Sequence, residues 1–473
     1  MPLILGTNSI KDTGYNVANS LRFDDGSSDS LTKTASTPTN NKKQTSSVWV
    51  KRSALSGSSN FGIMGFVDTS SPSNSRHHLY FYNDQLAAFY KDPTITRLDL
   101  KTNRLFRDTS AWYHIVLAID TTQGTASDRT KLYVNGVQET SFATSDYPVQ
   151  DITFLDSGET LQVGRLTTSG GSQQYFDGYI AEAVFIDGQA LDPTSFGEFD
   201  SDSPNIWKPI DVSGLTFGTN GFYLAFENAS SLGADVSGNS NNFTVNNLTS
   251  VDQSTDTCTN NFCTLNPLIG SNNITLSEGN LYASTTSASW STQSSTFSLS
   301  QGKWYLEVYV VGYNHNALGV QFAENASLRA TAFPSELAGG FGFKFYDGSK
   351  TSLAADSASY GNAVSNGQTV GMALDLDNHK IYFSINGTFQ NSGVPTSGST
   401  GTGSAFDLTT GKDYVIYNAL NHQPGNAISS FNFGSPPHSI SSGNSDANGF
   451  GNFEYSVPSG YFSLCTKNLA EFG

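Results

Sequence analysis

The chain has 473 residues and a formal net charge of −17, and only 14% of its residues are charged. This balance opposes nucleic-acid binding, because phosphate contacts need a cationic patch and no Lys/Arg cluster exceeds the short stretches NKKQ and VKR. The start of the chain lacks the features of a signal peptide, and no run approaches the roughly 18 apolar residues of a membrane span. We therefore expect no membrane insertion and no nucleic-acid partner.

Strand signals recur along the whole chain, whereas helical periodicity is scarce. Runs with a period of two residues are bounded by Gly, Asn, Asp and Ser, as in SSVWVKR (46–52), WYHIVLAID (112–120) and WYLEVYVVGY (304–313). Many short strands separated by turn residues are typical of β-sandwiches, and jelly-roll connectivity fits strands that pair across long sequence distances. We predict an all-β protein with two β-sandwich domains joined by an Asn-rich connector.

Composition predicts where these parts begin and end. The predicted parts are an N-terminal attachment segment (1–17), a first jelly roll (18–205), a connector (206–265) and a second sandwich with a C-terminal tail (266–473). The connector is polar, rich in Asn and poor in strand signal, so we interpret it as an ordered crossing segment rather than a domain.

In the first predicted jelly roll, the strand at 112–119 carries large or apolar residues on both faces, which predicts a central strand covered on both sides. Its His114 is interpreted as a core or inter-strand histidine rather than a catalyst. Asn135-Gly136 predicts a tight hairpin turn, because these residues tolerate positive φ. His77 and His78 are neighbours on a strand, so they face opposite sides and cannot bind one metal together.

Four pieces of this predicted jelly roll occur in the order found in a known family. The matching residues are Trp112, Tyr113, His114, Leu132, Tyr133, Val134, Asn135, Gly136, Val163, Gly164, Arg165, Phe176, Gly178, Ile180 and Glu182. Over about residues 18–200 the chain resembles the laminin-G-like, concanavalin A-like jelly roll. The resemblance implies binding of glycans or proteins through loops at one rim, sometimes with calcium. Asp120 and Asp128, which flank the loop after the Trp112 strand, are the candidate calcium ligands, and the alternative is that they are solvated loop acids.

The three cysteines do not form a disulfide framework, because their number is odd and only Cys258 and Cys263 lie close in sequence. We interpret Cys258, Cys263 and Cys465 as thiols. A local disulfide between Cys258 and Cys263 is the alternative.

The stretch DLDNHKIYFSING (375–387) allows two interpretations. Asp375 and Asp377 share a strand face, so a contact of two carboxylates with a metal is geometrically feasible. A calcium loop of the EF-hand type, however, also needs a Gly and a late Glu that are absent at the required spacing. We favour a hairpin in which Asn378 and His379 form the turn and KIYFSI returns.

The second predicted sandwich resembles the SPRY domain, a related β-sandwich, over about residues 266–464. The matching residues are Gly302, Lys303, Trp304, Tyr305, Glu307, Val308, Gly371, Leu374, Asp375, Asp377, Ile381, Phe383, Asn386, Gly387, Phe431, Asn432, Phe433 and Gly434. This resemblance implies an interaction module without a catalytic centre, in which variable loops select the partner.

The segments DVSGNSNNF (235–243), DTCTNNFCTLNPL (256–268) and VPSGYFSLCTKNLAEF (457–472) resemble stretches of large virion proteins of tailed phages. We therefore predict a virion structural protein, located in the virion as a fibre, tail-associated protein or capsid appendage. Its predicted partners are other virion proteins, further copies of itself and host surface polysaccharide.

Catalytic signatures are missing from the sequence, which contains no G-x-S-x-G elbow, phosphate-binding loop or H-E-x-x-H pair. We predict no catalytic residues and no cofactor apart from the calcium considered above. Two alternatives stay open, namely a purely architectural capsid or tail protein with no host ligand, and a polysaccharide depolymerase.

Overall fold

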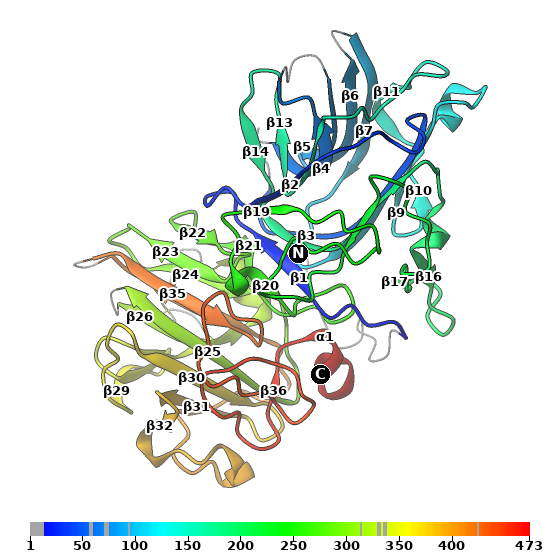
Figure 1. Ribbon diagram of the computed structural model, residues 1–473. Helices are drawn as coiled ribbons and strands as arrows, with labels where there is room; N and C mark the ends of the chain where they lie inside the picture. The colour runs from blue at the N-terminus through cyan, green and yellow to red at the C-terminus, as the bar shows by residue number, and fades with distance from the viewer. Residues whose placement is uncertain are drawn as a thin grey trace. The chain divides into compact units, whose positions relative to one another are not determined.

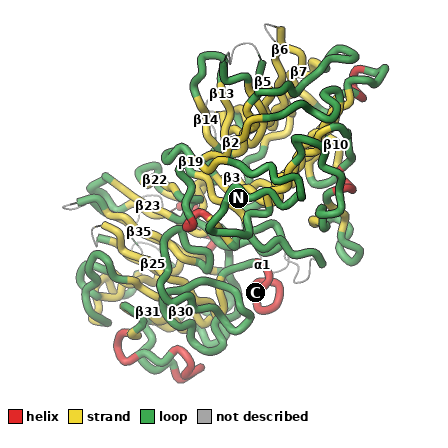
Figure 2. Tube along the Cα trace, viewed as in Figure 1, coloured by secondary structure: helices red, strands yellow, loops and turns green. Residues whose placement is uncertain are grey.

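The computed structural model describes residues 14–55, 60–70, 75–92, 95–312, 315–328, 333, 338–422 and 425–473. Strands dominate these ranges, and the one α-helix among them is α1 (Thr466–Phe472) (Figure 2). No helix in this part of the chain has the length and apolar character needed to cross a bilayer. One compact unit ends at Thr259 and the other begins at Asn260. The predicted attachment segment 1–17 lies almost entirely outside the described residues.

The first unit is a sandwich of two antiparallel sheets (Figure 1). The β8 sheet contains, in spatial order, β10 (Val137–Gln138), β9 (Thr130–Val134), β8 (Trp112–Asp120), β3 (Lys43–Arg52), β15 (Gly178–Asp187), β1 (Ser20–Phe23) and β20 (Gln253–Ser254), with β18 (Phe222–Leu224) also paired to β15. The β5 sheet contains β11 (Phe142–Asp146), β7 (Ile95–Leu105), β6 (Gln85–Asp92), β5 (Arg76–Tyr82), β4 (Asn60–Val67), β12 (Thr160–Val163), β2 (Ser30–Thr34) and β19 (Thr244–Asn246). Two further hairpins are β13 (Arg165–Thr167) with β14 (Gln173–Tyr175) and β16 (Gly197–Phe199) with β17 (Trp207–Pro209).

Strand β8 is covered on both faces, as its composition predicts. Ile115 and Leu117 point into the core between the two sheets. On the other face, Val116 packs in a separate cluster with Val184 and Tyr223. The prediction of a central, doubly covered strand is confirmed.

The segment predicted as an Asn-rich connector contributes short strands to the first unit. Strand β18 pairs with β15, β19 pairs with β2, and β20 pairs with β1. Asparagine side chains hold this segment: the Nδ2 atoms of Asn239 and Asn241 both donate to the Gly221 carbonyl, at 2.9 and 2.8 Å. The asparagines that look like a loop signal are thus hydrogen-bonding partners of the backbone.

The second unit is also a two-sheet sandwich. One sheet contains, in spatial order, β21 (Leu265–Gly270), β24 (Ser291–Ser295), β34 (Tyr414–Leu420), β26 (Asn316–Phe322), β27 (Phe341–Lys344), β28 (Ser349–Ser352) and β29 (Ala355–Ser359). The β25 sheet contains β22 (Ile274–Ser277), β23 (Tyr282–Thr285), β35 (Ala427–Asn432), β25 (Lys303–Gly312), β30 (Thr369–Asp375), β31 (Lys380–Ile385) and β32 (Thr388–Phe389), with β33 (Phe406–Asp407) on β31 and β36 (Phe462–Ser463) parallel to β25. The predicted fold class, all-β with two sandwich units, is confirmed.

The stretch DLDNHKIYFSING forms a hairpin. Strands β30 and β31 pair with Asp375 opposite Lys380, and His379 in the turn has a φ of 56°. The Asp375 carboxylate accepts hydrogen bonds from the Asn378 amide and from Lys303, both at 2.9 Å, and Asp377 accepts one from the Gly302 amide at 2.8 Å. Both carboxylates therefore bind internal donors, and the hairpin interpretation is confirmed.

The C-terminal segment, which follows β35, covers the outer face of the β25 sheet (Figure 1). On this face Tyr305 packs against Phe453 and Tyr461 of the segment. Glu307, on the same face, is buried and fixes this segment. Its carboxylate accepts hydrogen bonds from the backbone amides of Glu454 and Tyr455, both at 2.8 Å. Two charge-assisted bonds to backbone amides hold the segment in one position on the sheet.

Candidate functional site

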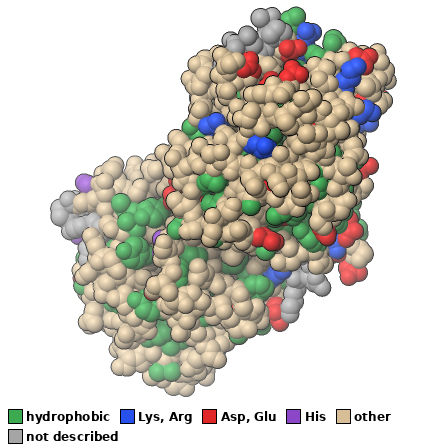
Figure 3. Space-filling view, viewed as in Figure 1, with side chains coloured by type: hydrophobic (Ala, Val, Ile, Leu, Met, Phe, Trp, Pro, Cys, Tyr) green, Lys and Arg blue, Asp and Glu red, His purple; other side chains and the backbone are tan. Residues whose placement is uncertain are grey.

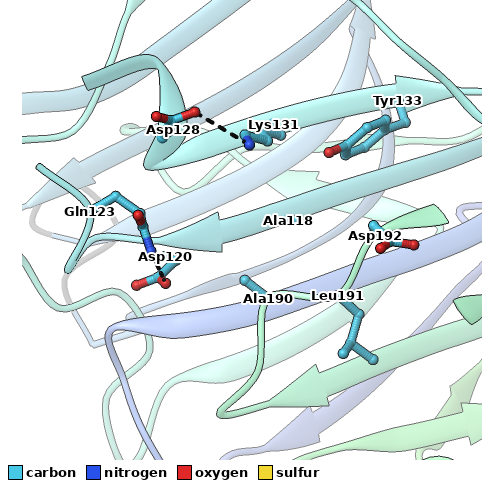
Figure 4. A pocket seen from close by; sticks show the side chains of 9 residues that line it. All are labelled: Ala118, Asp120, Gln123, Asp128, Lys131, Tyr133, Ala190, Leu191 and Asp192. Atoms are coloured by element: carbon cyan, nitrogen blue, oxygen red, sulfur yellow. Dashed lines mark hydrogen bonds and ion pairs between the residues drawn. The ribbon is translucent and has the colours of Figure 1, made fainter. Parts of the chain in front are cut away.

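The predicted calcium ligands Asp120 and Asp128 line one hollow of the first unit, with a volume of about 390 Å³ (Figure 4). Asp120 ends β8, and Asp128 lies in the loop that leads to β9. The other residues that line this hollow are Ala118, Gln123, Lys131, Tyr133, Ala190, Leu191 and Asp192.

Of the carboxylates in this hollow, Asp120 and Asp128 contact internal donors. Lys43 lies 3.1 Å from Asp120, and Lys131 lies 3.3 Å from Asp128. Burial raises the pKa of Asp120, but hydrogen bonds from Thr122 and Gln123 and the contact with Lys43 outweigh this effect and lower the pKa to about 2. The Asp120 carboxylate is thus charged and already accepts hydrogen bonds from nitrogen and oxygen donors of the protein.

Calcium takes six to eight oxygen ligands, and the arrangement around Asp120 does not fit such a cage. Within the described ranges, no group of three or more His, Cys, Asp or Glu side chains is placed to hold a metal ion. Although the described geometry does not support it, calcium binding by Asp120 and Asp128 is not tested by the structure and stays a prediction.

The histidines of the first unit occupy structural positions of different kinds. The His114 ring stacks on Trp49 at 4.7 Å, and its two nitrogens hydrogen-bond with Ser47 Oγ and Trp207 Nε1, both at 2.9 Å. Burial lowers the pKa of His114 to about 3, so the ring is neutral at physiological pH. Although Ser47 and His114 are in contact, both are buried, which agrees with the interpretation of His114 as an inter-strand residue.

His77 and His78 face opposite sides of the β5 sheet, as the strand geometry predicts. His77 stacks on Phe66 in the core at 4.8 Å, whereas the His78 ring lies beside Tyr80 on the outer face at 6.3 Å. Burial lowers the pKa of both rings to about 3.

The outer face of the β5 sheet contains a second hollow, which we call the His78 hollow. Its volume is about 170 Å³, which exceeds the roughly 150 Å³ of an apolar cavity known to accept one six-membered ring. The residues that line it are Asn60, Arg76, His78, Tyr80, Phe89, Leu166, Thr168 and Ser169.

The hairpin β13–β14 forms one wall of this hollow, because it lies directly on β4 (Figure 1). Gly62 of β4 makes this close approach possible. A Cβ atom at Gly62 would lie 2.3 Å from the carbonyl carbon of Arg165, a distance that would displace the hairpin. The hairpin tip at Thr168 and Ser169 then borders the hollow.

Two hydrogen-bonding atoms in the wall of the His78 hollow have no hydrogen-bonding partner among the described residues. They are His78 Nε2 and Asn60 Oδ1, and both are buried. Burying such an atom without a hydrogen bond costs about 1–3 kcal/mol of stability, so nearly all buried polar atoms in folded proteins have partners. A ligand hydroxyl would supply the missing hydrogen bonds.

Aromatic and cationic groups complete the wall. Arg76 is half-buried and places its guanidinium over the Phe89 ring at 5.2 Å. Tyr80 is half-buried beside His78. Flat rings next to hydrogen-bonding groups suit a ligand that has both C–H faces and hydroxyls, as a sugar ring has.

Sequence reasoning did not find this hollow. Alternation along β5 does place Arg76, His78 and Tyr80 on one face, so the strand pattern could have identified them as a group. Their covering hairpin comes from residues about 90 positions later, a pairing that local pattern does not reveal.

The cysteines are thiols, and no disulfide joins any two of them. Cys263 and Cys465 are buried, and Cys258 is partly buried. Burial raises the pKa of the Cys465 thiol to about 11, which makes it unreactive at neutral pH. The interpretation as thiols is confirmed, and the alternative of a Cys258–Cys263 disulfide is wrong.

Residues 25–194 match the family described as the concanavalin A-like lectin/glucanases superfamily. No curated protein matches the chain.

Solved structures with a similar fold include the SPRY domain of human HERC1, which is 12% identical, covers 35% of this chain and 96% of its own, and gives a TM-score of 0.29. A heptameric SAP-like pentraxin from Limulus polyphemus is 14% identical, covers 38% of this chain and 80% of its own, and gives a TM-score of 0.28. A protein from Bacteroides ovatus with a suggested role in carbohydrate binding is 15% identical, covers 49% of this chain and 59% of its own, and gives a TM-score of 0.32. The predicted resemblance to a concanavalin A-like jelly roll is thus confirmed for residues 25–194, and SPRY domains are among the structures that resemble this chain.

Proposed function

We propose that this protein binds glycans without cleaving them, and that a sugar ring enters the His78 hollow. The proposal rests on two buried atoms that have no partner in the described part of the chain, His78 Nε2 and Asn60 Oδ1, beside the Tyr80 and Phe89 rings. Sugar hydroxyls both donate and accept, so they satisfy an imidazole nitrogen and an amide oxygen, while sugar C–H faces pack on aromatic rings.

The charge of the wall favours an acidic sugar. Arg76 is the one charged residue among the eight that line the hollow. Its planar guanidinium matches a carboxylate, with which it can form two parallel hydrogen bonds. A glycan with a uronic acid or another carboxylate-bearing sugar is therefore the ligand class that we propose.

A purely binding role is supported by the absence of carboxylates among the described residues that line the hollow. Most glycoside hydrolases place two carboxylates across the scissile bond, and none of the eight lining residues is Asp or Glu. The buried carboxyl groups of Glu182 and Glu307 have raised pKa values because of burial, but their hydrogen bonds go to Tyr223 and to backbone amides of the covering segments.

We further propose that the chain is a structural component of a phage virion, such as a fibre, a tail-associated protein or a capsid appendage. Support comes from the resemblance of 235–243, 256–268 and 457–472 to virion proteins and from the low share of charged residues. The face shown in Figure 3 is dominated by uncharged polar groups and backbone, with Lys and Arg scattered singly. Such a surface suits exposure on a particle, where several copies would raise the effective affinity for a polysaccharide.

A glycan array probed with the whole chain tests the binding proposal. We expect retention on acidic polysaccharides and weaker retention on neutral ones. Arg76→Gln should reduce the affinity for acidic glycans about 10- to 100-fold, as expected when a hydrogen bond to a charged group is lost. Arg104→Gln is the matched control, because Arg104 is an exposed arginine of the same unit that pairs with Glu139.

Other outcomes would overturn parts of the proposal. No retention on any glycan would favour a purely architectural protein, and release of reducing ends from a retained polysaccharide would favour a depolymerase. Locating the chain in an intact particle tests the virion proposal, which absence from the particle would contradict. Burial at a vertex or collar would instead contradict exposure to the host.

A further inference from the structure

The second unit contains a hollow of a different chemical character, which we call the Tyr309 hollow. It lies on the outer face of the β25 sheet, at the edge of the C-terminal covering segment, and has a volume of about 510 Å³. This volume falls within the range of about 300–1,000 Å³ that is typical of small-ligand sites. Its wall contains Tyr309 of β25, His438, Ile440 and Ser441 of the loop after β35, and Glu454 and Tyr455 of the covering segment.

Three rings surround this hollow. The ring centroids of Tyr309 and His438 are 5.4 Å apart with an angle of 34° between the planes. Ser430 Oγ and His438 Nδ1 form a hydrogen bond of 2.7 Å, which fixes the imidazole. Tyr309, His438 and Tyr455 are all half-buried, so each presents part of a π-face or edge to a ligand.

Glu454 supplies the negative charge of the wall. Its carboxylate accepts hydrogen bonds from the backbone amide of Ser441, at 2.8 Å, and from the Ser441 hydroxyl. These bonds lower the pKa of Glu454, so the carboxylate is ionised at neutral pH. None of the residues that line the hollow is Lys or Arg, and no described residue forms an ion pair with Glu454. The nearby His438 imidazole also lowers the pKa of Glu454 through its charge.

The positions of Glu454 and Tyr455 are fixed before a ligand binds. Both backbone amides donate to the buried Glu307 carboxylate, at 2.8 Å each. A wall that is rigid in advance loses little conformational entropy on binding, which favours affinity.

An ionised carboxylate next to aromatic rings is the arrangement that recognises organic cations, because a ring face attracts a cation and the carboxylate adds a direct ion pair. We propose that the Tyr309 hollow binds a ligand carrying an organic ammonium group, with the ammonium between Glu454 and the rings of Tyr309 and Tyr455. The ammonium can belong to an amino sugar or to a quaternary amine such as choline. This site is independent of the His78 hollow and of the glycan proposed there.

Titration of the whole chain with choline, glucosamine, glucose and glucuronate, followed by isothermal calorimetry or NMR, tests this proposal. We expect measurable binding of at least one of the two ammonium ligands, weaker binding of glucose and none of glucuronate at this hollow. A preference for choline over glucosamine would identify a quaternary amine as the source, and the reverse preference would identify an amino sugar.

Two variants locate the site. Glu454→Gln keeps the shape of the side chain and removes its charge, so the affinity for the ammonium ligand should fall about tenfold or more. Glu324→Gln is the control, since Glu324 is an exposed carboxylate of the same unit that pairs with Lys412. Equal affinities of wild type and Glu454→Gln, or binding of both ammonium ligands no stronger than that of glucose, would overturn the proposal. Because Arg76→Gln leaves this hollow untouched, loss of glycan binding and loss of ammonium binding are distinguishable.

Discussion

At the scale of single residues, the first unit contains a carboxyl group whose protonation is linked to folding. Glu182 lies at a bulge in β15 with a φ of 49°, and its carboxyl group accepts a hydrogen bond from Tyr223 Oη at 2.7 Å. Burial, assisted by the charges of Glu227 and Asp211, raises the pKa of Glu182 to about 7. The usual value is 4.5, so the folded state holds this proton over a pH range in which the unfolded state has released it.

The first prediction is a loss of stability as the pH rises. Below pH 4.5 both states are protonated at Glu182, and between 4.5 and 7 only the folded state is, so the free energy of unfolding falls as pH increases through this window. The change from Glu182 is about 3 kcal/mol, and Glu159, whose pKa burial also raises to about 7, acts in the same direction.

Urea denaturation at pH 5 and pH 8 measures this slope. In Glu182→Gln, whose side chain cannot ionise, the free energy of unfolding should fall less between pH 5 and pH 8. The difference from wild type should be about the contribution of Glu182. A slope that is unchanged in Glu182→Gln would show that this carboxyl is not protonated in the folded protein.

The second prediction concerns His78. Within the described chain its imidazole forms no hydrogen bond, so the ring weakens the fold unless a ligand is bound. His78→Phe keeps an aromatic ring beside Tyr80 and removes the unpartnered nitrogen. We expect this variant to raise the free energy of unfolding by about 1 kcal/mol while glycan binding is lost. Thermal unfolding together with glycan retention measures both effects, and a destabilised variant that still binds glycan would contradict the assignment.

At the scale of elements, the hairpin β13–β14 is the part that turns an open sheet face into a hollow. Its position depends on Gly62, where the backbone of Arg165 approaches β4. The third prediction is that Gly62→Ala displaces the hairpin, lowers the free energy of unfolding by about 1–3 kcal/mol and weakens glycan binding. Gly124→Ala is the control, since a Cβ at Gly124 has no neighbour within 4 Å. Unaltered glycan binding in a destabilised Gly62→Ala variant would show that the hairpin does not shape the site.

The elements that the sequence predicts are those whose cause is local. The turn at Asn135-Gly136 has φ values of 49° and 77°, as two adjacent residues that tolerate positive φ require. The hairpin β30–β31 and the two faces of β8 follow from alternation in the same way.

The elements that escape prediction depend on distant partners. Strand β19 is three residues long and gains its stability from β2, more than 200 residues earlier. The His78 hollow combines β5 with a hairpin whose approach depends on a glycine in β4, and the Tyr309 hollow combines β25 with the C-terminal segment. Neither combination has a local sequence signal, although alternation alone groups Arg76, His78 and Tyr80.

At the scale of the whole molecule, two basic side chains of the VKR stretch are buried in ion pairs inside the fold. Lys51 pairs with Asp256 at 2.7 Å and Arg52 pairs with Asp84 at 3.0 Å, and both basic side chains are 1% exposed. The VKR stretch therefore offers no surface for phosphates. Removing one partner of such a buried pair leaves an uncompensated charge, which costs about 3–5 kcal/mol.

The fourth prediction concerns several copies acting together. If the chain is displayed in multiple copies on a particle, the apparent affinity for a polysaccharide should exceed that of one chain by about 10²- to 10⁴-fold. Competition of the isolated chain against particles for immobilised polysaccharide measures this ratio. A ratio near one would contradict multivalent attachment.

We propose above all that the His78 hollow binds an acidic glycan and leaves it intact. Calorimetric titration of the best acidic oligosaccharide into wild type, Arg76→Gln and Arg104→Gln, with mass spectrometry of the ligand afterwards, tests it most directly. We expect saturable binding by wild type and Arg104→Gln, a loss of about tenfold or more in Arg76→Gln, and an uncleaved ligand. Equal affinity in all three proteins, or a shortened ligand, would contradict it.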